Sequence, residues 1–230
     1  MMNASRWAVS AALCASLGFA GTASAAEEGW YIVGFAGESS AANVKQGEID
    51  QNLIDFFGAA GLTIVDATSN LDDSDTGFGI AGGYQVSRNF AAELAYVDLG
   101  DIAYAATGTV TDGVNTADAE FGLDQSAAGP VFSLLGIWPI GERFSIFGKF
   151  GVALMSVDAD VDLTLDGVSE SDSASTDRSN LMYGVGGEFL FNPRFGVRLG
   201  WDRYAEVGSE DLTGDTDYDL ITLGLRYNFD

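Results

Sequence analysis

Bulky apolar residues alternate with small or polar residues in several segments of this chain, and this period of two limits the possible folds most. In residues 77–86, glycine, alanine or glutamine stands between the large side chains of Phe78, Ile80, Tyr84 and Val86. Successive side chains of a β-strand point to opposite faces, so the pattern predicts a strand with one apolar face. It recurs in residues 90–96, 144–154, 181–189, 195–201 and 221–229.

Two further strands, around residues 30–37 and 126–138, alternate less cleanly, so their inward face stays open; the total is eight. In the six segments that alternate regularly, charged residues share one face with glycines, and aliphatic and aromatic residues occupy the other face. Ten tilted strand residues reach roughly 23 Å, the height of an outer-membrane apolar band. We therefore predict an all-β fold, an eight-stranded antiparallel up-and-down transmembrane β-barrel whose apolar face meets lipid, because only closed structures satisfy their backbone groups in hydrocarbon.

The connections between these strands alternate between short and long. Residues 87–89, 139–142 and 192–194 are tight, whereas residues 39–76, 101–125, 158–178 and 206–217 are long and polar. This asymmetry predicts four long extracellular loops, with both termini on the periplasmic side. In the first loop, Ile49, Leu53, Ile54 and Phe57 are spaced for a short amphipathic helix that caps the barrel mouth.

The first residues have the features of a cleaved export signal. Arg6 precedes an apolar core, and Ala23-Ser24-Ala25 is a small-residue cleavage site. We expect residues 1–25 to be removed and residues 26–230 to form the barrel. The single cysteine, Cys14, lies in this signal, so no disulfide or thiolate metal site is expected in the mature chain.

Composition narrows the class of function. The formal net charge of −24 argues against nucleic acid as a partner, because phosphate backbones attract clustered Lys and Arg. The chain has no histidine, which excludes Ser-His hydrolases, and no carboxylate pair lies in an evident cleft. We expect neither an enzyme nor a cofactor. Residues 77–82 match a dinucleotide fingerprint only formally, since strand alternation runs through them.

Several of these segments resemble a known family. Residues 77–86, 92–101, 195–198 and 223–229 are similar to the transmembrane domain of the outer membrane protein A family. The resemblance implies Sec export, insertion by the barrel assembly machinery and residence in the bacterial outer membrane, among lipid and lipopolysaccharide. We expect the peptidoglycan-binding module of longer family members to be absent.

Charged residues on the predicted inner face form the main candidate site. They are Glu93, Lys149, Glu188, Arg198 and Arg226, with Asp202 nearer the outer end. An unpaired buried ion costs several kcal/mol, so we expect these groups to pair across the lumen. The family resemblance implies the same for the first four. Two interpretations stay open: a network that fills and rigidifies the core, or a gate that passes small solutes.

Clustered aspartates dominate the predicted loops. They fall in three groups: Asp72, Asp73 and Asp75; Asp158, Asp160 and Asp162; and Asp215, Asp217 and Asp219. A solvated acidic surface is the simpler interpretation, and divalent bridging to lipopolysaccharide is the alternative. Near Asp162, Asp166 and Gly167 a calcium loop is almost matched, but Ser173 replaces the required Glu. The function we expect is structural or surface interaction, with a narrow channel and an adhesin or ligand-binding barrel as alternatives.

Overall fold

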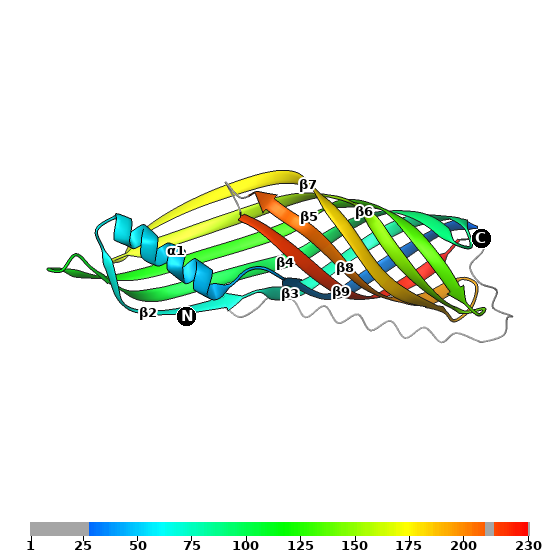
Figure 1. The fold of residues 1–230 in the computed structure, drawn as a ribbon, viewed down its shortest axis with the longest axis horizontal. Helices are drawn as coiled ribbons and strands as arrows, with labels where there is room; N and C mark the ends of the chain where they lie inside the picture. The colour runs from blue at the N-terminus through cyan, green and yellow to red at the C-terminus, as the bar shows by residue number, and fades with distance from the viewer. Residues whose placement is uncertain (1–27, 210–213, 230) are drawn as a thin grey trace.

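The computed structural model describes residues 28–209 and 214–229, which form one β-barrel with an extension at one end (Figure 1). The cleaved signal expected at residues 1–25 lies outside this range. The elements are β1 (Gly29–Ala41), α1 (Gln46–Ala59), β2 (Thr63–Asp72), β3 (Ser74–Ser87), β4 (Phe90–Thr111), β5 (Thr116–Ile140), β6 (Phe144–Leu165), β7 (Val168–Leu190), β8 (Phe195–Ser209) and β9 (Gly214–Asn228).

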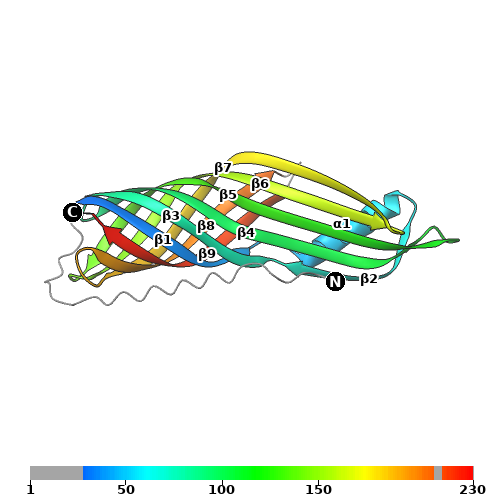
Figure 2. The same ribbon diagram turned by 180° about the vertical axis from the view of Figure 1, so that it is seen from behind.

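Eight of the strands form a closed ring, as the alternation predicts. Each strand of the ring pairs antiparallel with its neighbours, and β1 closes the ring by pairing with both β3 and β9 (Figure 2). Closure leaves no free strand edge in the ring, so its backbone groups are satisfied by the ladders themselves. The predicted antiparallel up-and-down barrel is confirmed. Within the described part of the chain, no helix is long and apolar enough to cross a membrane.

Apolar side chains cover the outside of the ring, and its interior holds the buried ionic side chains together with two clusters of buried apolar residues. Leu223 is 63% exposed and Leu225 is 69% exposed, whereas Glu93 and Arg198 are 3% and 6% exposed. This orientation is the reverse of a water-soluble barrel, and it is the one that the sequence predicts for a wall in contact with lipid.

The structure also shows which residues face inward in the two strands that alternate less regularly. In β1, Tyr31 and Val33 turn inward and Trp30 turns outward; in β5, Ser133 turns inward between outward-facing neighbours. Trp30 and Trp138 are exposed near the ends of β1 and β5, and aromatic girdles at the two membrane interfaces are typical of outer-membrane barrels.

Tyr204 lies near the end of β8, where an interfacial aromatic residue would be expected, but it does not face the interface. Tyr204 is buried inside the barrel, together with Asp202 and Tyr218. As far as Tyr204, the even-numbered residues of β8 point inward. The parity of a residue in its strand therefore decides on which side of the wall its side chain lies.

The three tight connections are found where the sequence predicts them, but the long polar stretches are mostly strand rather than loop. β4 continues to Thr111 and β5 begins at Thr116; β6 and β7 are joined by a turn at Asp166 and Gly167. Both turn residues have positive φ (48° and 80°), which suits a two-residue hairpin. Thr, Val, Ala and Ser alternate in these stretches and pair across them, so the hairpins extend beyond the ring.

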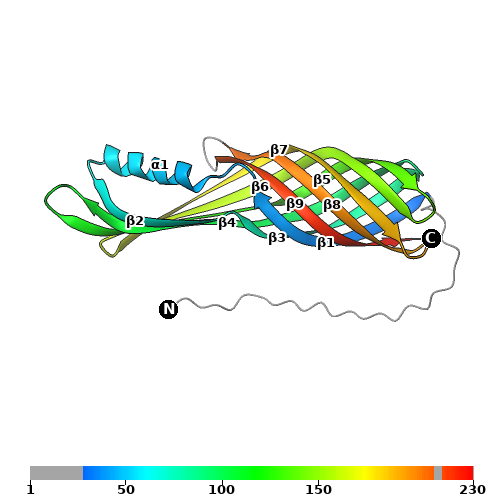
Figure 3. The ribbon, with the colours of Figure 1, turned by 60° about the horizontal axis from the view of Figure 1, so that its bottom comes forward.

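A ninth strand, β2, was not predicted. Where β3 leaves β4, after Phe78 pairs with Asp98, the register of β4 shifts around Gly100, whose φ is 75°. β2 then pairs with β4 from Asp72↔Ala103 onward. The extension is therefore an open sheet built from β2 and the outer halves of β4, β5, β6 and β7 (Figure 3); we call it the extended sheet.

The helix expected in the first loop is α1, but it does not cap the mouth of the barrel. It lies alongside the extended sheet, where Phe57 is buried against Val110 and Ala119 (Figure 3). The extended sheet offers α1 an apolar face, which the sequence analysis did not foresee because it treated these residues as loop.

Candidate functional site

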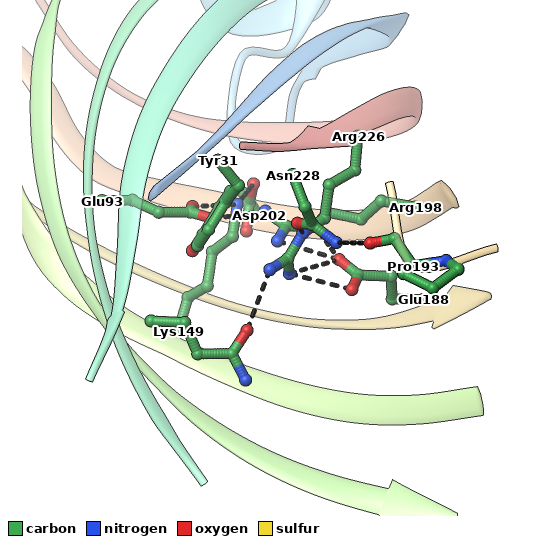
Figure 4. Close-up of polar contacts among 10 residues, drawn as sticks. Tyr31, Glu93, Lys149, Glu188, Pro193, Arg198, Asp202, Arg226 and Asn228 are labelled. Atoms are coloured by element: carbon green, nitrogen blue, oxygen red, sulfur yellow. Dashed lines mark hydrogen bonds and ion pairs between the residues drawn. The ribbon is translucent and has the colours of Figure 1, made fainter. Parts of the chain in front are cut away.

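The charged residues predicted for the lumen meet in one cluster inside the ring (Figure 4). Five strands supply them, each from an inward position: β4 carries Glu93, β6 carries Lys149, β7 carries Glu188, β8 carries Arg198 and Asp202, and β9 carries Arg226. Their side chains are at most 9% exposed. We call these six residues the lumen network.

Ion pairs join the lumen network into a chain of alternating charge. Arg198 lies at its centre, with Nη1 2.5 Å from an oxygen of Glu93 and Nη2 3.0 Å from an oxygen of Glu188. Beyond Glu188, the Nη1 atom of Arg226 is 2.9 Å from a carboxylate oxygen.

On the other side of Arg198, the chain continues through Lys149. Its Nζ atom lies 3.8 Å from Glu93 Oε2 and 3.0 Å from Asp202 Oδ2. Three acids and three bases thus neutralise one another, which offsets part of the cost of taking each ion out of water.

Three neutral side chains form hydrogen bonds with the lumen network, and the sequence analysis did not single them out. The Tyr31 hydroxyl donates to Glu93 over 2.8 Å. Arg226 donates from Nη2 to Gln85 over 2.8 Å and from Nε to Asn228 over 2.7 Å. Tyr31 was missed because its strand alternates imperfectly; its inward parity only becomes clear from its pairing with Gly83.

Aromatic rings pack against two of the buried guanidinium groups. The guanidinium carbon of Arg226 lies 3.7 Å from the centre of the Tyr31 ring, and that of Arg198 lies 4.9 Å from the centre of the Phe147 ring. Both contacts have the geometry of cation–π interactions.

Inward glycines make room for these rings more than for the charged groups. A Cβ atom on Gly83 would lie 2.2 Å from Cζ of Tyr31, and one on Gly186 would lie 2.3 Å from Cζ of Phe147. At Gly184 the nearest atom is part of a charged group, the Asp202 carboxylate. These inward glycines therefore accommodate a charged side chain at Gly184 and an aromatic ring at Gly83 and at Gly186.

Little free volume remains around the lumen network. A cavity of about 10 Å³ lies beside Lys149, Arg198 and Asp202, and one of about 20 Å³ lies beside Gln85 and Arg226. A single water needs about 10–15 Å³. These two cavities are therefore each about the size of one water molecule.

Residues 25–230 match the model of the OmpA-like transmembrane domain. The chain belongs to this family. It is an outer-membrane β-barrel of the OmpA-like type, as the sequence resemblance implied. No curated protein matches the sequence.

Solved structures of outer-membrane barrels are similar to this OmpA-like barrel. Ail, the attachment invasion locus protein of Yersinia pestis, is 19% identical, and the match covers 89% of this chain and 99% of Ail, with a TM-score of 0.40. Neisserial surface protein A is 12% identical, with coverages of 87% and 97% and a TM-score of 0.43. The N-terminal β-barrel domain of Pseudomonas aeruginosa OprF is 12% identical, with coverages of 88% and 100% and a TM-score of 0.43.

Two of the acidic clusters of the OmpA-like barrel lie apart from the lumen network. Asp158, Asp160 and Asp162 alternate along the exposed side of β6, and Asp72, Asp73 and Asp75 are exposed near the junction of β2 and β3. No group of three or more acidic, His or Cys residues placed to hold a metal ion occurs among residues 28–209 and 214–229.

The near-match to a calcium loop is not a calcium loop in this fold. Asp166 and Gly167 form a hairpin turn, whereas Asp162 and Ser173 lie in the paired strands β6 and β7. A calcium loop wraps its ligands around one point, and a flat hairpin spreads them along its length instead.

Proposed function

We propose that this OmpA-like barrel is a closed, non-enzymatic anchor that holds a folded acidic sheet outside the outer membrane. The observation that carries the proposal is the lumen network: six buried ions of zero net charge, with cavities of only about 10 and 20 Å³ beside them. Passage of a solute would require several buried ion pairs to separate at once, and each exposed partner would lose its compensation.

Conductance in planar bilayers tests this proposal against the narrow-channel alternative. The experiment compares the wild-type protein with Glu93→Ala, which removes the carboxylate shared by Arg198, Lys149 and Tyr31. Arg203→Ala is the control, because Arg203 pairs with Asp219 outside the lumen network. A closed anchor gives no channel currents in wild type and no larger currents in Glu93→Ala than in the control. Discrete wild-type currents that Glu93→Ala enlarges would establish a gate.

The extended sheet separately supports a role in binding molecules outside the cell. This sheet holds the alternating aspartates of β6 in a fixed array on paired strands. We propose that the array contacts an external ligand, or lipopolysaccharide phosphates through divalent cations. Calorimetry with calcium checks the second form, and an absence of saturable heat would remove it.

Shortening the hairpins tests surface contact without disturbing the ring. Ala103 pairs with Asp124, and Val157 pairs with Thr176. Replacement of residues 104–123 and of residues 158–175, each by a two-residue Asn-Gly turn, therefore closes shorter hairpins on residues that are already paired and removes the three aspartates of β6. Binding to lipopolysaccharide or to cells should vanish, while the heat-dependent gel shift of a folded barrel persists. Binding that survives the replacement would contradict a role for the extended sheet.

Export and assembly are further parts of the proposal. Removal of residues 1–25 by signal cleavage would begin the mature chain at Ala26, and the barrel assembly machinery would insert it. The mass of the protein recovered from outer-membrane fractions checks this directly. A mass that retains Met1 to Ala25 would contradict signal cleavage.

A further inference from the structure

A cavity of about 540 Å³ lies outside the ring, between α1 and the extended sheet. The helix contributes Leu53, Ile54 and Phe57 to its wall, and the sheet contributes Ile64, Val110 and Phe121. Well-packed cores leave few voids larger than a water molecule, whereas small-molecule sites measure about 300–1,000 Å³. The cavity is therefore of the size and apolar character of a ligand site.

The ionisable side chains that line this cavity are Asp50, Asp66 and Tyr104, and no described lining residue is basic. Tyr104 donates a 2.6 Å hydrogen bond to Asp50. Hydrogen bonds from Tyr104 and Ser69 hold the pKa of Asp50 below its usual range, so its carboxylate is ionised at neutral pH. Burial and the bond to Asp50 raise the pKa of Tyr104 to about 12, so its hydroxyl keeps its proton.

We propose that this cavity binds small cationic amphiphiles, molecules with an aromatic or aliphatic body and an ammonium group. The apolar walls favour the body, and the carboxylates of Asp50 and Asp66 favour the ammonium. Anionic amphiphiles with the same body are repelled by these two groups and by the chain's net charge of −24. The inference concerns the extended sheet alone and holds whether or not the barrel conducts.

Three probes with one aromatic body separate charge from hydrophobicity: 1-naphthylmethylamine, 1-naphthylmethanol and 1-naphthoate. Each is titrated by fluorescence against the full-length mature barrel in phosphatidylcholine nanodiscs, with empty nanodiscs as the correction for partition into lipid. The amine should bind saturably and about ten-fold more tightly than the alcohol, and the naphthoate should bind more weakly than both. Equal binding of amine and naphthoate would overturn the proposal.

Two neighbouring residues of β4 provide a matched pair of variants. Ala106 lines the cavity, whereas Ala105 is exposed on the opposite face of the same strand. Ala106→Trp fills the cavity and should abolish saturable binding, and Ala105→Trp should bind as wild type does. Both variants must keep the heat-dependent gel shift, which reports the ring independently of the extended sheet. Equal affinity in the two variants would place the probe elsewhere and overturn the proposal.

A third variant tests the charge. Asp50→Asn keeps an oxygen that accepts from Tyr104 and removes the negative charge, so it should lower the preference for amine over alcohol while leaving the alcohol's affinity unchanged. A double variant with Asp66→Asn should erase the preference. If the preference for amine persists without both carboxylates, the charge argument fails.

Discussion

Arg226 stacks on Tyr31, with its guanidinium carbon 3.7 Å from the ring centre, while the hydroxyl of the same ring donates to Glu93 over 2.8 Å. Tyr31 thus contacts the terminal base of the lumen network and one of its central acids. β1 closes the ring between β3 and β9. Through Tyr31, this closing strand contacts Glu93 on β4 and Arg226 on β9.

Tyr31→Phe should destabilise the barrel by about 1.5–3 kcal/mol, because it removes one hydrogen bond to a buried carboxylate and keeps the stacked ring. Tyr31→Leu should cost more, because the cation–π contact with Arg226 is lost as well. Urea unfolding of the barrel in phosphatidylcholine vesicles measures both. A Phe variant as stable as wild type would mean that the hydroxyl bond contributes nothing.

Gly83→Ala should destabilise the barrel by about 1–3 kcal/mol through overpacking, because the new Cβ atom meets the Tyr31 ring. Gly82→Ala is the matched control: Gly82 faces outward, and nothing lies within 4 Å of an added Cβ atom. The same unfolding experiment should find the control within about 0.5 kcal/mol of wild type or slightly more stable. Equal effects at the two positions would contradict close packing at Tyr31.

Arg226→Met should cost about 3–5 kcal/mol, because it leaves an uncompensated negative charge among the remaining five ions of the lumen network. Arg203→Met removes an ion pair that is 22–28% exposed, so its loss should cost about 1 kcal/mol or less. The contrast between the two unfolding free energies is the measurement. A variant at position 226 no less stable than the one at 203 would show that the buried charges are hydrated.

Leu223→Arg should destabilise the barrel in vesicles by about 2–4 kcal/mol, the cost of a basic side chain near the centre of a bilayer. Val168 is equally exposed, at 68%, but it stands at the β6–β7 hairpin turn beyond the ring. Val168→Arg should therefore change stability little. If the two substitutions cost the same, the wall around Leu223 does not face lipid.

Acid should loosen α1 before it unfolds the ring. Hydrogen bonds from Tyr104 and Ser69 lower the pKa of Asp50 in the folded chain. The stabilisation is therefore present above the usual Asp pKa of about 3.9 and is lost as the pH falls through the depressed value. Hydrogen exchange of residues 46–59, normalised to intrinsic rates, should rise between pH 5 and pH 2 relative to the ring.

Tyr104→Phe is the control for this prediction, because it removes the hydrogen bond. Exchange of α1 in that variant should be faster at pH 5 and should depend less on pH. On the alkaline side the sign reverses: the pKa of Tyr104 is raised to about 12, so its contribution is present below about pH 10 and is lost as the pH rises through 12. A helix whose exchange ignores pH in both proteins would contradict the link between Asp50 and Tyr104.

Alternation along the chain was sufficient to predict the ring, its orientation and which charged side chains turn inward. The reason is local: in a strand, the parity of a residue fixes its side, so Glu93 and Arg198 had to lie opposite the aliphatic face. The same pattern also predicted the tight turns, because the alternation is interrupted at residues 87–89, 139–142 and 192–194.

Features that depend on contacts between distant segments were decided only by the tertiary structure. The pairing of β2 with β4, the length of the hairpins and the position of α1 depend on ladders between residues far apart in sequence, which no local period encodes. The partners of each charge, the inward place of Tyr204 and the cavity beside Asp50 also arise only when the strands are set in register. The residue type and its parity in the strand determine which side chains turn inward. The distances between those side chains are determined only when the ring closes.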